Sequence, residues 1–292
     1  MTAERSWAPG HVLDLHGTVG VLRRGAGDPA YARTSDGALW RAVHTPDGPG
    51  TLRLHLSGGV VTAQAWGSGA PWLLENAPAM TGAHDDPSAL VPRHEVLERA
   101  VAASPGLRLT RSNRVWETLV PTVLEQKVVG AEAFRAWRYL LRRHGTVAPG
   151  PDGRPDLRVP PPREGWAAIG DWEWHRAGVE PVRMRTIVGA SAVAVEHRPE
   201  RLGALPGIGP WTVGELLGRA CGDPDAVPVG DYHLPRIVGI GLAGEALDDA
   251  GMLEVLEPYR GQRGRVIRLL VRAGVDRERR GPRVSVRDYR AW

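Results

Sequence analysis

The most informative segment of this chain is Leu-Pro-Gly-Ile-Gly-Pro-Trp-Thr, at residues 205–212. Two glycines flank one apolar residue, and an apolar helical pattern begins directly afterwards at Trp211. Because glycine reaches positive φ values, Gly207 and Gly209 allow a very tight turn between two helices. The free N–H groups and the dipole at the start of the second helix then favour an anion. The sequence therefore predicts a helix-hairpin-helix at about residues 203–221 that binds a DNA phosphate without reading sequence.

A second motif, Val-Gly-Asp-Tyr-His at residues 229–233, follows about twenty residues later and leads into another helical pattern. A hairpin with an aspartate at this distance resembles the helix-hairpin-helix DNA glycosylase superfamily, and most of all bacterial 3-methyladenine DNA glycosylase II. The resemblance covers roughly residues 10–275. It implies an α+β fold, in which a small N-terminal antiparallel β domain precedes an all-helical glycosylase core.

Composition sets broad limits on the protein. The chain has 292 residues, is 42% apolar and carries a net charge of +4, and its pI of 9.7 points mildly to a polyanionic partner. One cysteine, Cys221, excludes an internal disulfide and a four-cysteine zinc site. The N-terminus lacks the continuous apolar region typical of a secretory leader, and no apolar run is long enough to span a membrane. We therefore expect a monomeric cytoplasmic protein that does not bind membranes.

Strand and helix signals divide the chain into three parts. Alternating segments such as residues 51–56 and 60–66, joined by Gly58-Gly59, predict an antiparallel β domain within residues 1–90, with a further strand at 17–25. Residues 67–92 are rich in Gly, Pro and Asp and are expected to form an irregular boundary. Helical periodicity dominates residues 91–276, which we assign to the core, and residues 277–292 form a highly charged tail.

Asp231 is the candidate catalytic residue. Positive charge develops on deoxyribose when a base departs, and a carboxylate near C1′ stabilises that charge and orients or deprotonates water. The resemblance places the family's catalytic aspartate at this position. A purely structural alternative is that Asp231 caps the following helix, which has Pro235 in its first turn. The two roles are compatible.

Trp211 indicates the subclass. In the related enzymes that also cut the DNA backbone, the matching position is a lysine that forms an imine with the sugar, and an indole cannot do so. The sequence therefore predicts a monofunctional enzyme. The predicted pocket for an extruded base contains Trp211, Trp116, Tyr232 and Glu215. Glu215 departs from the family pattern, which has a stacking aromatic residue there.

The remaining candidate residues concern DNA and a cation. The predicted DNA-binding residues are Gly207, Ile208, Gly209, Thr212, Gln126 and Lys127. Lys127, the only lysine, stands where the resemblance places an apolar wedge that fills the space of the extruded base. The resemblance also implies a structural monovalent cation bound by the carbonyls of Gly203, Leu205 and Ile208. No cofactor is required for hydrolysis.

The sequence thus predicts a monofunctional DNA glycosylase that removes alkylated bases such as 3-methyladenine during base excision repair. Its expected partner is double-stranded DNA containing damaged bases. Three alternatives stay open: a non-catalytic protein that binds DNA damage, a glycosylase for uracil or oxidised bases, and a lyase that uses Lys127.

Overall fold

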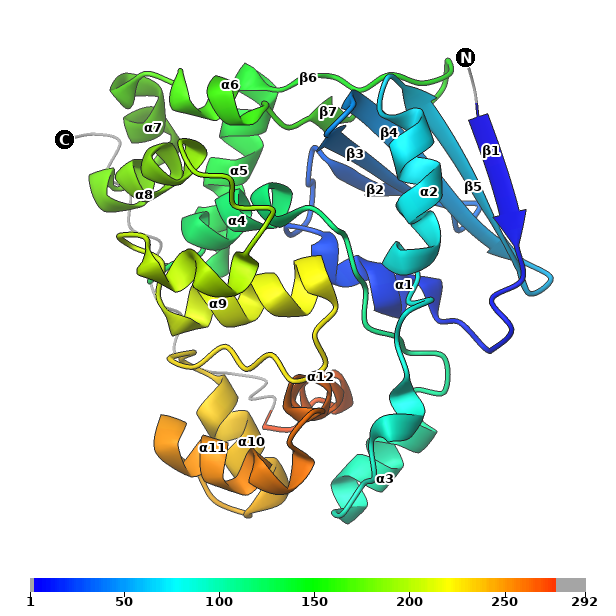
Figure 1. The fold of residues 1–292 in the computed structure, drawn as a ribbon, viewed down its shortest axis with the longest axis vertical. Coiled ribbons are helices and arrows are strands. Elements are labelled where there is room, and N and C mark those ends of the chain that lie inside the picture. Colours follow the sequence, from blue (N-terminus) through cyan, green and yellow to red (C-terminus); the bar gives the residue numbers. More distant parts are fainter. Residues whose placement is uncertain (1–2, 277–292) are drawn as a thin grey trace.

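The computed structural model describes residues 3–276 and consists of an N-terminal sheet followed by a mainly helical region (Figure 1). The sheet is antiparallel, has five strands and runs in the order β1-β5-β4-β3-β2. Its strands are β1 Ala3–Trp7, β2 Tyr31–Arg33, β3 Leu39–Thr45, β4 Gly48–Ser57 and β5 Val60–Gly67. This arrangement confirms the predicted α+β fold class. The predicted tail at residues 277–292 lies outside the described residues.

Alternation of side chains makes β4 and β5 a pair with two different faces. In β4, Leu52 and Leu54 are fully buried, whereas Arg53 between them points to the other face. Gly58 and Gly59 both have positive φ, 57° and 78°, which is the backbone that a two-residue hairpin between right-twisted strands needs. The pairing of Ser57 with Val60 therefore follows from local sequence.

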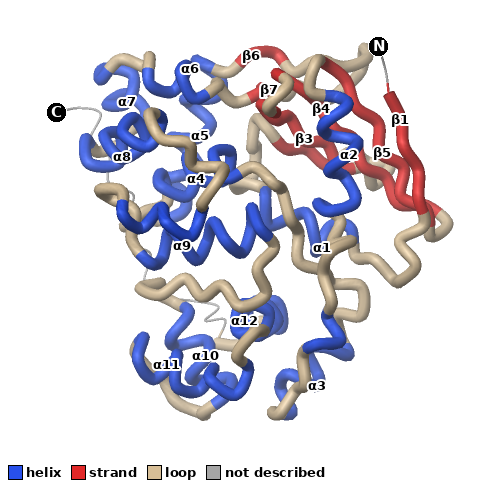
Figure 2. Tube along the Cα trace, viewed as in Figure 1, coloured by secondary structure: helices blue, strands red, loops and turns tan. Residues whose placement is uncertain are grey.

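Helix α2, Ala70–Met80, covers one face of the sheet (Figure 2). Its Leu73, Ala77 and Met80 join a cluster with buried residues of β3, β4 and β5. On the opposite face, Trp40 stacks on Trp66 at 5.3 Å, and both pack against a short hairpin of β6 Thr146–Val147 and β7 Arg158–Val159. The sheet is therefore covered by α2 on one face and, around Trp40 and Trp66, by the β6–β7 hairpin on the other.

Three N-terminal segments differ from the sequence expectation. Residues 3–7, where no strand was assigned from the sequence, form an edge strand, because β1 pairs with β5 while its polar side chains stay exposed. Residues 15–19 form helix α1, Leu15–Val19, where a strand was expected, because Asp14 accepts the Gly17 N–H and caps the turn. Helix α2 occupies part of the expected irregular boundary, with Pro71 tolerated in its first turn.

The helical region contains ten further α-helices among the described residues. They are α3 Glu95–Ala102, α4 Val115–Leu124, α5 Gly130–His144, α6 Arg163–Ala167, α7 Asp171–Ala177, α8 Pro181–Ser191, α9 Pro210–Leu216, α10 Leu234–Leu242, α11 Asp249–Leu256 and α12 Arg263–Ala273. In Figure 1, α9 crosses the middle of the molecule between the α4–α8 group and the α10–α12 group. No helix within residues 3–276 is long and apolar enough to cross a membrane.

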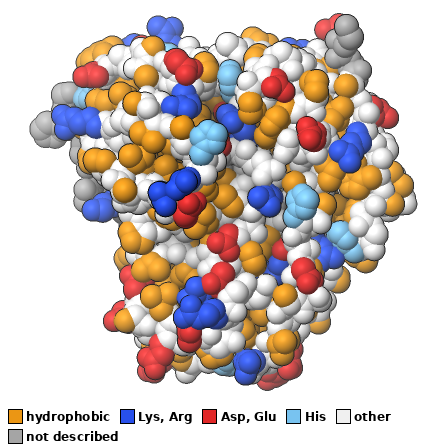
Figure 3. Space-filling model, in the orientation of Figure 1, with side chains coloured by type: hydrophobic (Ala, Val, Ile, Leu, Met, Phe, Trp, Pro, Cys, Tyr) orange, Lys and Arg blue, Asp and Glu red, His pale blue; other side chains and the backbone are white. Residues whose placement is uncertain are grey.

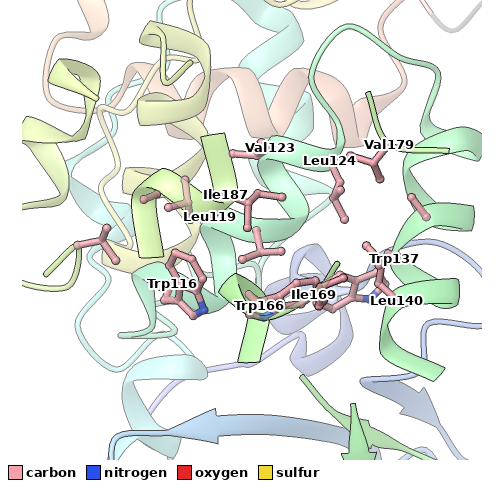
Figure 4. Packing of buried hydrophobic residues seen from close by; sticks show 14 of the residues in the cluster. Trp116, Leu119, Val123, Leu124, Trp137, Leu140, Trp166, Ile169, Val179 and Ile187 are labelled. Carbon is pink, nitrogen blue, oxygen red and sulfur yellow. The ribbon is translucent and has the colours of Figure 1, made fainter. Parts of the chain in front are cut away.

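Tryptophans fill the core of the α4–α8 group (Figure 4). Trp166 lies 6.1 Å from Trp137 and 5.9 Å from Trp174, ring centre to ring centre. Each buried aromatic side chain removes about 150–250 Å² from water, which makes this cluster a large part of the stabilisation. A separate apolar cluster joins α3 to α10, α11 and α12. Helix α9 packs against α4, so it has a rigid support.

Glu117, on α4, is buried at the seam between the helical region and Arg41 of β3. Burial raises its pKa to about 7, and Arg114 and Arg41 offset this only in part. The folded protein therefore retains a proton that the unfolded chain releases from about pH 4.3, so stability is lost as the pH rises from there to about 7.

We expect Glu117→Gln, which cannot titrate, to lose less thermal stability between pH 5 and pH 8 than the unmodified chain. Thermal unfolding at four pH values in this interval measures the difference. Glu98→Gln, at an exposed position of α3, is the matched control. Parallel pH curves for Glu117→Gln and the unmodified chain would contradict the expectation.

Candidate active site

The hairpin turn precedes α9 and depends on two glycines. Gly207 has φ of 82°, and a Cβ there would lie 2.0 Å from Oγ1 of Thr186, so only glycine fits without displacing α8. Gly209 caps α9 with an extended backbone, and a Cβ there would meet nothing within 4 Å. Between them, the buried Ile208 side chain anchors the turn in the helical core. The turn is thus packed against α8 and the helical core at Gly207 and Ile208, and it faces open space at Gly209.

The donors available to a phosphate at the hairpin are fewer than the sequence suggested. The Ile208 N–H donates to the Leu205 carbonyl at 3.1 Å, and the Thr212 hydroxyl is buried and accepts a hydrogen bond from Gln126. Of the four predicted hairpin residues, Gly207 and Gly209 are exposed, and their backbone N–H groups are the ones that can face a phosphate.

Gln126 joins the turn between α4 and α5 to the hairpin. Its Nε2 donates to the Gly207 carbonyl and to Oγ1 of Thr212, both at 2.9 Å. The next residue, Lys127, is exposed and has a positive φ of 54°, which is uncommon for a residue with a side chain. The two predicted DNA-facing elements are therefore brought together, and Lys127 projects from the tip of one of them.

Asp231 is held by three hydrogen bonds at the start of α10. One carboxylate oxygen accepts the backbone N–H groups of His233 at 2.8 Å and Leu234 at 3.0 Å. The other oxygen accepts the indole Nε1–H of Trp211 at 3.0 Å. The N-cap residue of α10 is His233 and not Asp231, but Asp231 still accepts the first N–H groups of that helix and lies beside the hairpin helix. Because a carboxylate has about four lone-pair sites, one oxygen keeps free acceptor capacity.

The contact between Trp211 and Asp231 links the start of α9 to the segment that leads into α10. Trp211 comes from the first turn of α9, and its half-buried indole crosses to Asp231 beyond the connecting loop. An ionised carboxylate fixed in orientation can stabilise a developing cation without reorganising. An indole offers no amine, so imine formation at this position is chemically excluded.

Trp211→Phe tests whether Trp211 positions Asp231. Phenylalanine keeps an aromatic ring but removes the N–H, and a hydrogen bond to a charged group contributes about 1.5–3 kcal/mol. We expect the single-turnover rate of base release to fall about 10- to 100-fold, while the affinity for duplex DNA stays unchanged.

The matched control is Trp172→Phe, at an exposed position of α7. A purely structural role of Trp211 would instead lower the melting temperature and weaken DNA affinity together. Equal rates for the two variants would show that the indole N–H does not position Asp231.

The other three predicted pocket residues lie in different environments. Glu215, one helical turn after Trp211, forms an ion pair with Arg219 at 2.6 Å. Trp116 is 1% exposed and belongs to the tryptophan core, so its ring presents no face to a base. Tyr232 is 91% exposed and packs edge-on against His233. Of the predicted set, Trp211 contacts Asp231 directly, and Glu215 shares its face of α9.

Two contacts of the site escaped the sequence prediction. Asp249 of α11 accepts the Gly230 N–H at 3.0 Å and so fixes the residue before Asp231. Arg236 of α10 pairs with Asp276 beyond α12. Neither pair is close in sequence, and no spacing signal links its members. In contrast, the ion pair of Glu215 and Arg219 can be predicted from the sequence, because the two residues are four positions apart on one helix face.

The chain resembles several solved structures in fold. No protein-family model matches the sequence, and no curated protein matches it. A 3-methyladenine DNA glycosylase from Archaeoglobus fulgidus is 15% identical and superimposes with a TM-score of 0.76 over 92% of this chain and 98% of its own. An 8-oxoguanine glycosylase/lyase from Clostridium acetobutylicum, bound to double-stranded DNA with cytosine opposite 8-oxoguanine, is 11% identical, with a TM-score of 0.73 over 94% and 97%.

A third match is shorter. The Schizosaccharomyces pombe 3-methyladenine DNA glycosylase, bound to abasic DNA, is 17% identical, with a TM-score of 0.51 over 64% of this chain and 95% of its own. At such low identity the likeness concerns the fold, and it extends over nearly the whole chain in the first two cases. The chain therefore has the fold of the helix-hairpin-helix DNA glycosylases.

Proposed function

We propose that this protein is a monofunctional DNA glycosylase in which Asp231 promotes hydrolysis of the N-glycosidic bond of a damaged nucleotide. The observation that carries the proposal is the fixed Asp231 carboxylate, held by the indole of Trp211 and by two N–H groups at the start of α10. One oxygen keeps a free lone pair to face the C1′ atom of an extruded nucleotide. Departure of the base leaves positive charge there, which the carboxylate stabilises.

Trp211 supports hydrolysis without strand cleavage. The position that would need an amine for imine formation holds an indole, and that indole is already engaged with Asp231. Lys127 is the only side-chain amine, and it lies at the α4–α5 turn. We therefore expect an abasic site, and not a broken strand, as the product.

Alkylated bases such as 3-methyladenine are the first proposed substrate class. Many such bases are cationic, so they leave readily and need little acid catalysis. Among the described residues, the hydrogen-bond partners of Asp231 are the Trp211 indole and two backbone N–H groups, and none of them is a side-chain acid that could protonate a base. The fold match to two 3-methyladenine glycosylases agrees with this choice.

Oxidised purines are a second candidate because of Glu215 and Arg219. A carboxylate and a guanidinium at 2.6 Å offer both an acceptor and donors to a neutral base that carries N–H and carbonyl groups. The fold match to an 8-oxoguanine glycosylase/lyase points in the same direction.

The proposed partner is double-stranded DNA, which would meet the amides of Gly207 and Gly209 and the exposed Lys127. A monovalent cation at the hairpin is a further proposal. The carbonyls of Gly203, Leu205 and Ile208 suit a hard cation. That of Leu205 already accepts the Ile208 N–H and keeps one lone pair for a cation.

Release of free base from a panel of duplexes tests the function. The panel contains 3-methyladenine, 7-methylguanine, hypoxanthine, uracil and 8-oxoguanine, each assayed under single-turnover conditions with and without alkali. We expect release of one purine class, with strand breaks only after alkali. Breaks without alkali, together with borohydride trapping that Lys127→Ala abolishes, would overturn the monofunctional assignment. DNA binding with no release from any duplex would favour a non-catalytic damage-binding protein.

A further inference from the structure

The two carboxylate oxygens of Glu215 have different surroundings. Glu215 lies one turn after Trp211 on the same face of α9, and Trp211 contacts Asp231. Oε2 of Glu215 is buried and lies 2.6 Å from Nη2 of Arg219. Oε1 has no partner within residues 3–276, and the side chain is 15% exposed. Because a polar atom withdrawn from bulk water is costly to leave unpaired, Oε1 is the oxygen that is left for a ligand.

A chain of four alternating charges holds Glu215 in place. Nη1 of Arg219 faces Oε2 of Glu125 at 3.9 Å, and Oε1 of Glu125 accepts a hydrogen bond from Nη1 of Arg24 at 2.9 Å. The Arg24 and Glu125 side chains are largely buried, so water and salt screen their pairing only weakly. Arg24 follows α1, Glu125 directly follows α4, and Arg219 follows α9. Three separate parts of the chain therefore fix the orientation of one carboxylate.

The backbone of α9 also changes at the residue that holds Glu215. Beyond Leu216 the helix continues as a π-helical turn over Leu217–Cys221, which contains Arg219. Such turns are rare and occur frequently at functional sites. The wider turn directs Arg219 differently from a regular α-helix, and its guanidinium meets both Glu215 and Glu125.

The surface around α9 has no dominant charge that could select a base. Among the described residues in Figure 3, acidic, basic and apolar side chains are intermixed on the face that carries α9. Recognition therefore depends on individual groups. Of the predicted pocket residues, Trp116 is buried in the core, Tyr232 is almost fully exposed and the Trp211 N–H is engaged with Asp231. Glu215 combines a partly buried position with an unpaired polar atom.

We propose that Glu215 selects the extruded base by accepting an N–H of its edge at Oε1, and that Glu125, acting through Arg219, positions Glu215. The inference rests on the proposed function, which places an extruded base beside Asp231. A carboxylate offers only acceptor sites. It therefore favours a purine with an N–H at its edge, such as hypoxanthine, and opposes one with acceptors alone, such as ethenoadenine or unsubstituted purine. Alkylated and oxidised purines that keep an N–H belong to the favoured class.

Binding to duplexes whose base cannot leave tests the selection without requiring catalysis. Three duplexes carry hypoxanthine, ethenoadenine or unsubstituted purine on a fluorinated arabinose that resists base loss. Ethenoadenine is larger than hypoxanthine and unsubstituted purine is smaller, so size does not explain a preference over both. We expect the unmodified chain to bind the hypoxanthine duplex about 10- to 100-fold more tightly, the effect of one hydrogen bond to a charged group. Comparing this preference between variants cancels differences in pairing and unstacking.

Four variants separate selection from positioning. Glu215→Gln has an amide that can accept or donate, so we expect the preference to fall by about 10-fold or more. Glu125→Gln keeps an acceptor for Arg24 but loses the charge that faces Arg219. Arg219→Lys keeps the charge but loses the fork that meets two carboxylates. Both are expected to lower the preference by a smaller factor. Glu254→Gln, at an exposed position of α11, is the control.

The outcomes keep the inference apart from the proposed function. Equal binding of the three duplexes by the unmodified chain, or an unchanged preference in Glu215→Gln, would refute the selection. A preference that falls in Glu215→Gln but stays unchanged in both Glu125→Gln and Arg219→Lys would refute the positioning. Parallel loss of affinity for all three duplexes together with a lower melting temperature would assign these residues to folding alone. If no duplex releases a base, the proposed function fails, and the binding preference still decides the inference.

Discussion

Asp231→Asn is expected to slow base release by about 10²–10⁴-fold, the range typical of a lost catalytic acid or base, while leaving DNA affinity nearly intact. Asparagine keeps one oxygen that can accept the N–H groups of His233 and Leu234, so the start of α10 is preserved. It removes the negative charge that stabilises the sugar cation, and its amide can point an N–H at the indole of Trp211. The single-turnover rate on the best duplex of the panel measures the loss.

A neighbouring carboxylate provides the control. Asp249 accepts the Gly230 N–H, one residue before Asp231, and Asp249→Asn keeps an acceptor there. We expect the Asp249 variant to retain most of the rate. If both variants lose activity equally, the effect arises from the loop and not from the Asp231 charge. If Asp231→Asn releases bases at the unmodified rate, another group performs the chemistry.

The position of Asp231 was predictable because the signals are local. A glycine with positive φ, a tight turn and an aspartate at the start of a helix are each specified by a few adjacent residues. The contact between Asp231 and Trp211 was not predictable, because it depends on how the loop at residues 222–230 returns to α9. Sequence therefore indicates Asp231 as a candidate, and tertiary structure identifies the side chain that contacts it.

The difference between local signals and tertiary contacts also explains which strands, helices and buried residues were predicted. The alternation in residues 51–56 and 60–66 predicted two strands because period-2 patterns report a half-buried sheet. Helix α1 has five residues, too few for a helical period to show. Trp116 has the spacing of a buried helix face, but spacing does not say whether a buried ring faces a ligand pocket or the core. Only packing resolved that choice.

Asp85→Ala is expected to destabilise the fold by about 3–5 kcal/mol, the cost of leaving a buried charge without its partner. Asp85, after α2, forms a two-pronged ion pair with Arg265 of α12, and the two side chains are 4% and 5% exposed. The same carboxylate accepts the Leu109 N–H at 2.9 Å. One carboxylate thus links the segment after α2 to α12, which packs against α10.

Free energies of unfolding from urea titration measure this effect, with Asp47→Ala, at an exposed turn, as the control. The double replacement Asp85→Leu with Arg265→Leu removes both charges, so we expect it to be less destabilised than Asp85→Ala alone. If Asp85→Ala costs no more than Asp47→Ala, the pair contributes nothing, and water must already solvate Arg265. If the double variant is the less stable of the two, the lost stability comes from the packing of α12 and not from an unpaired charge.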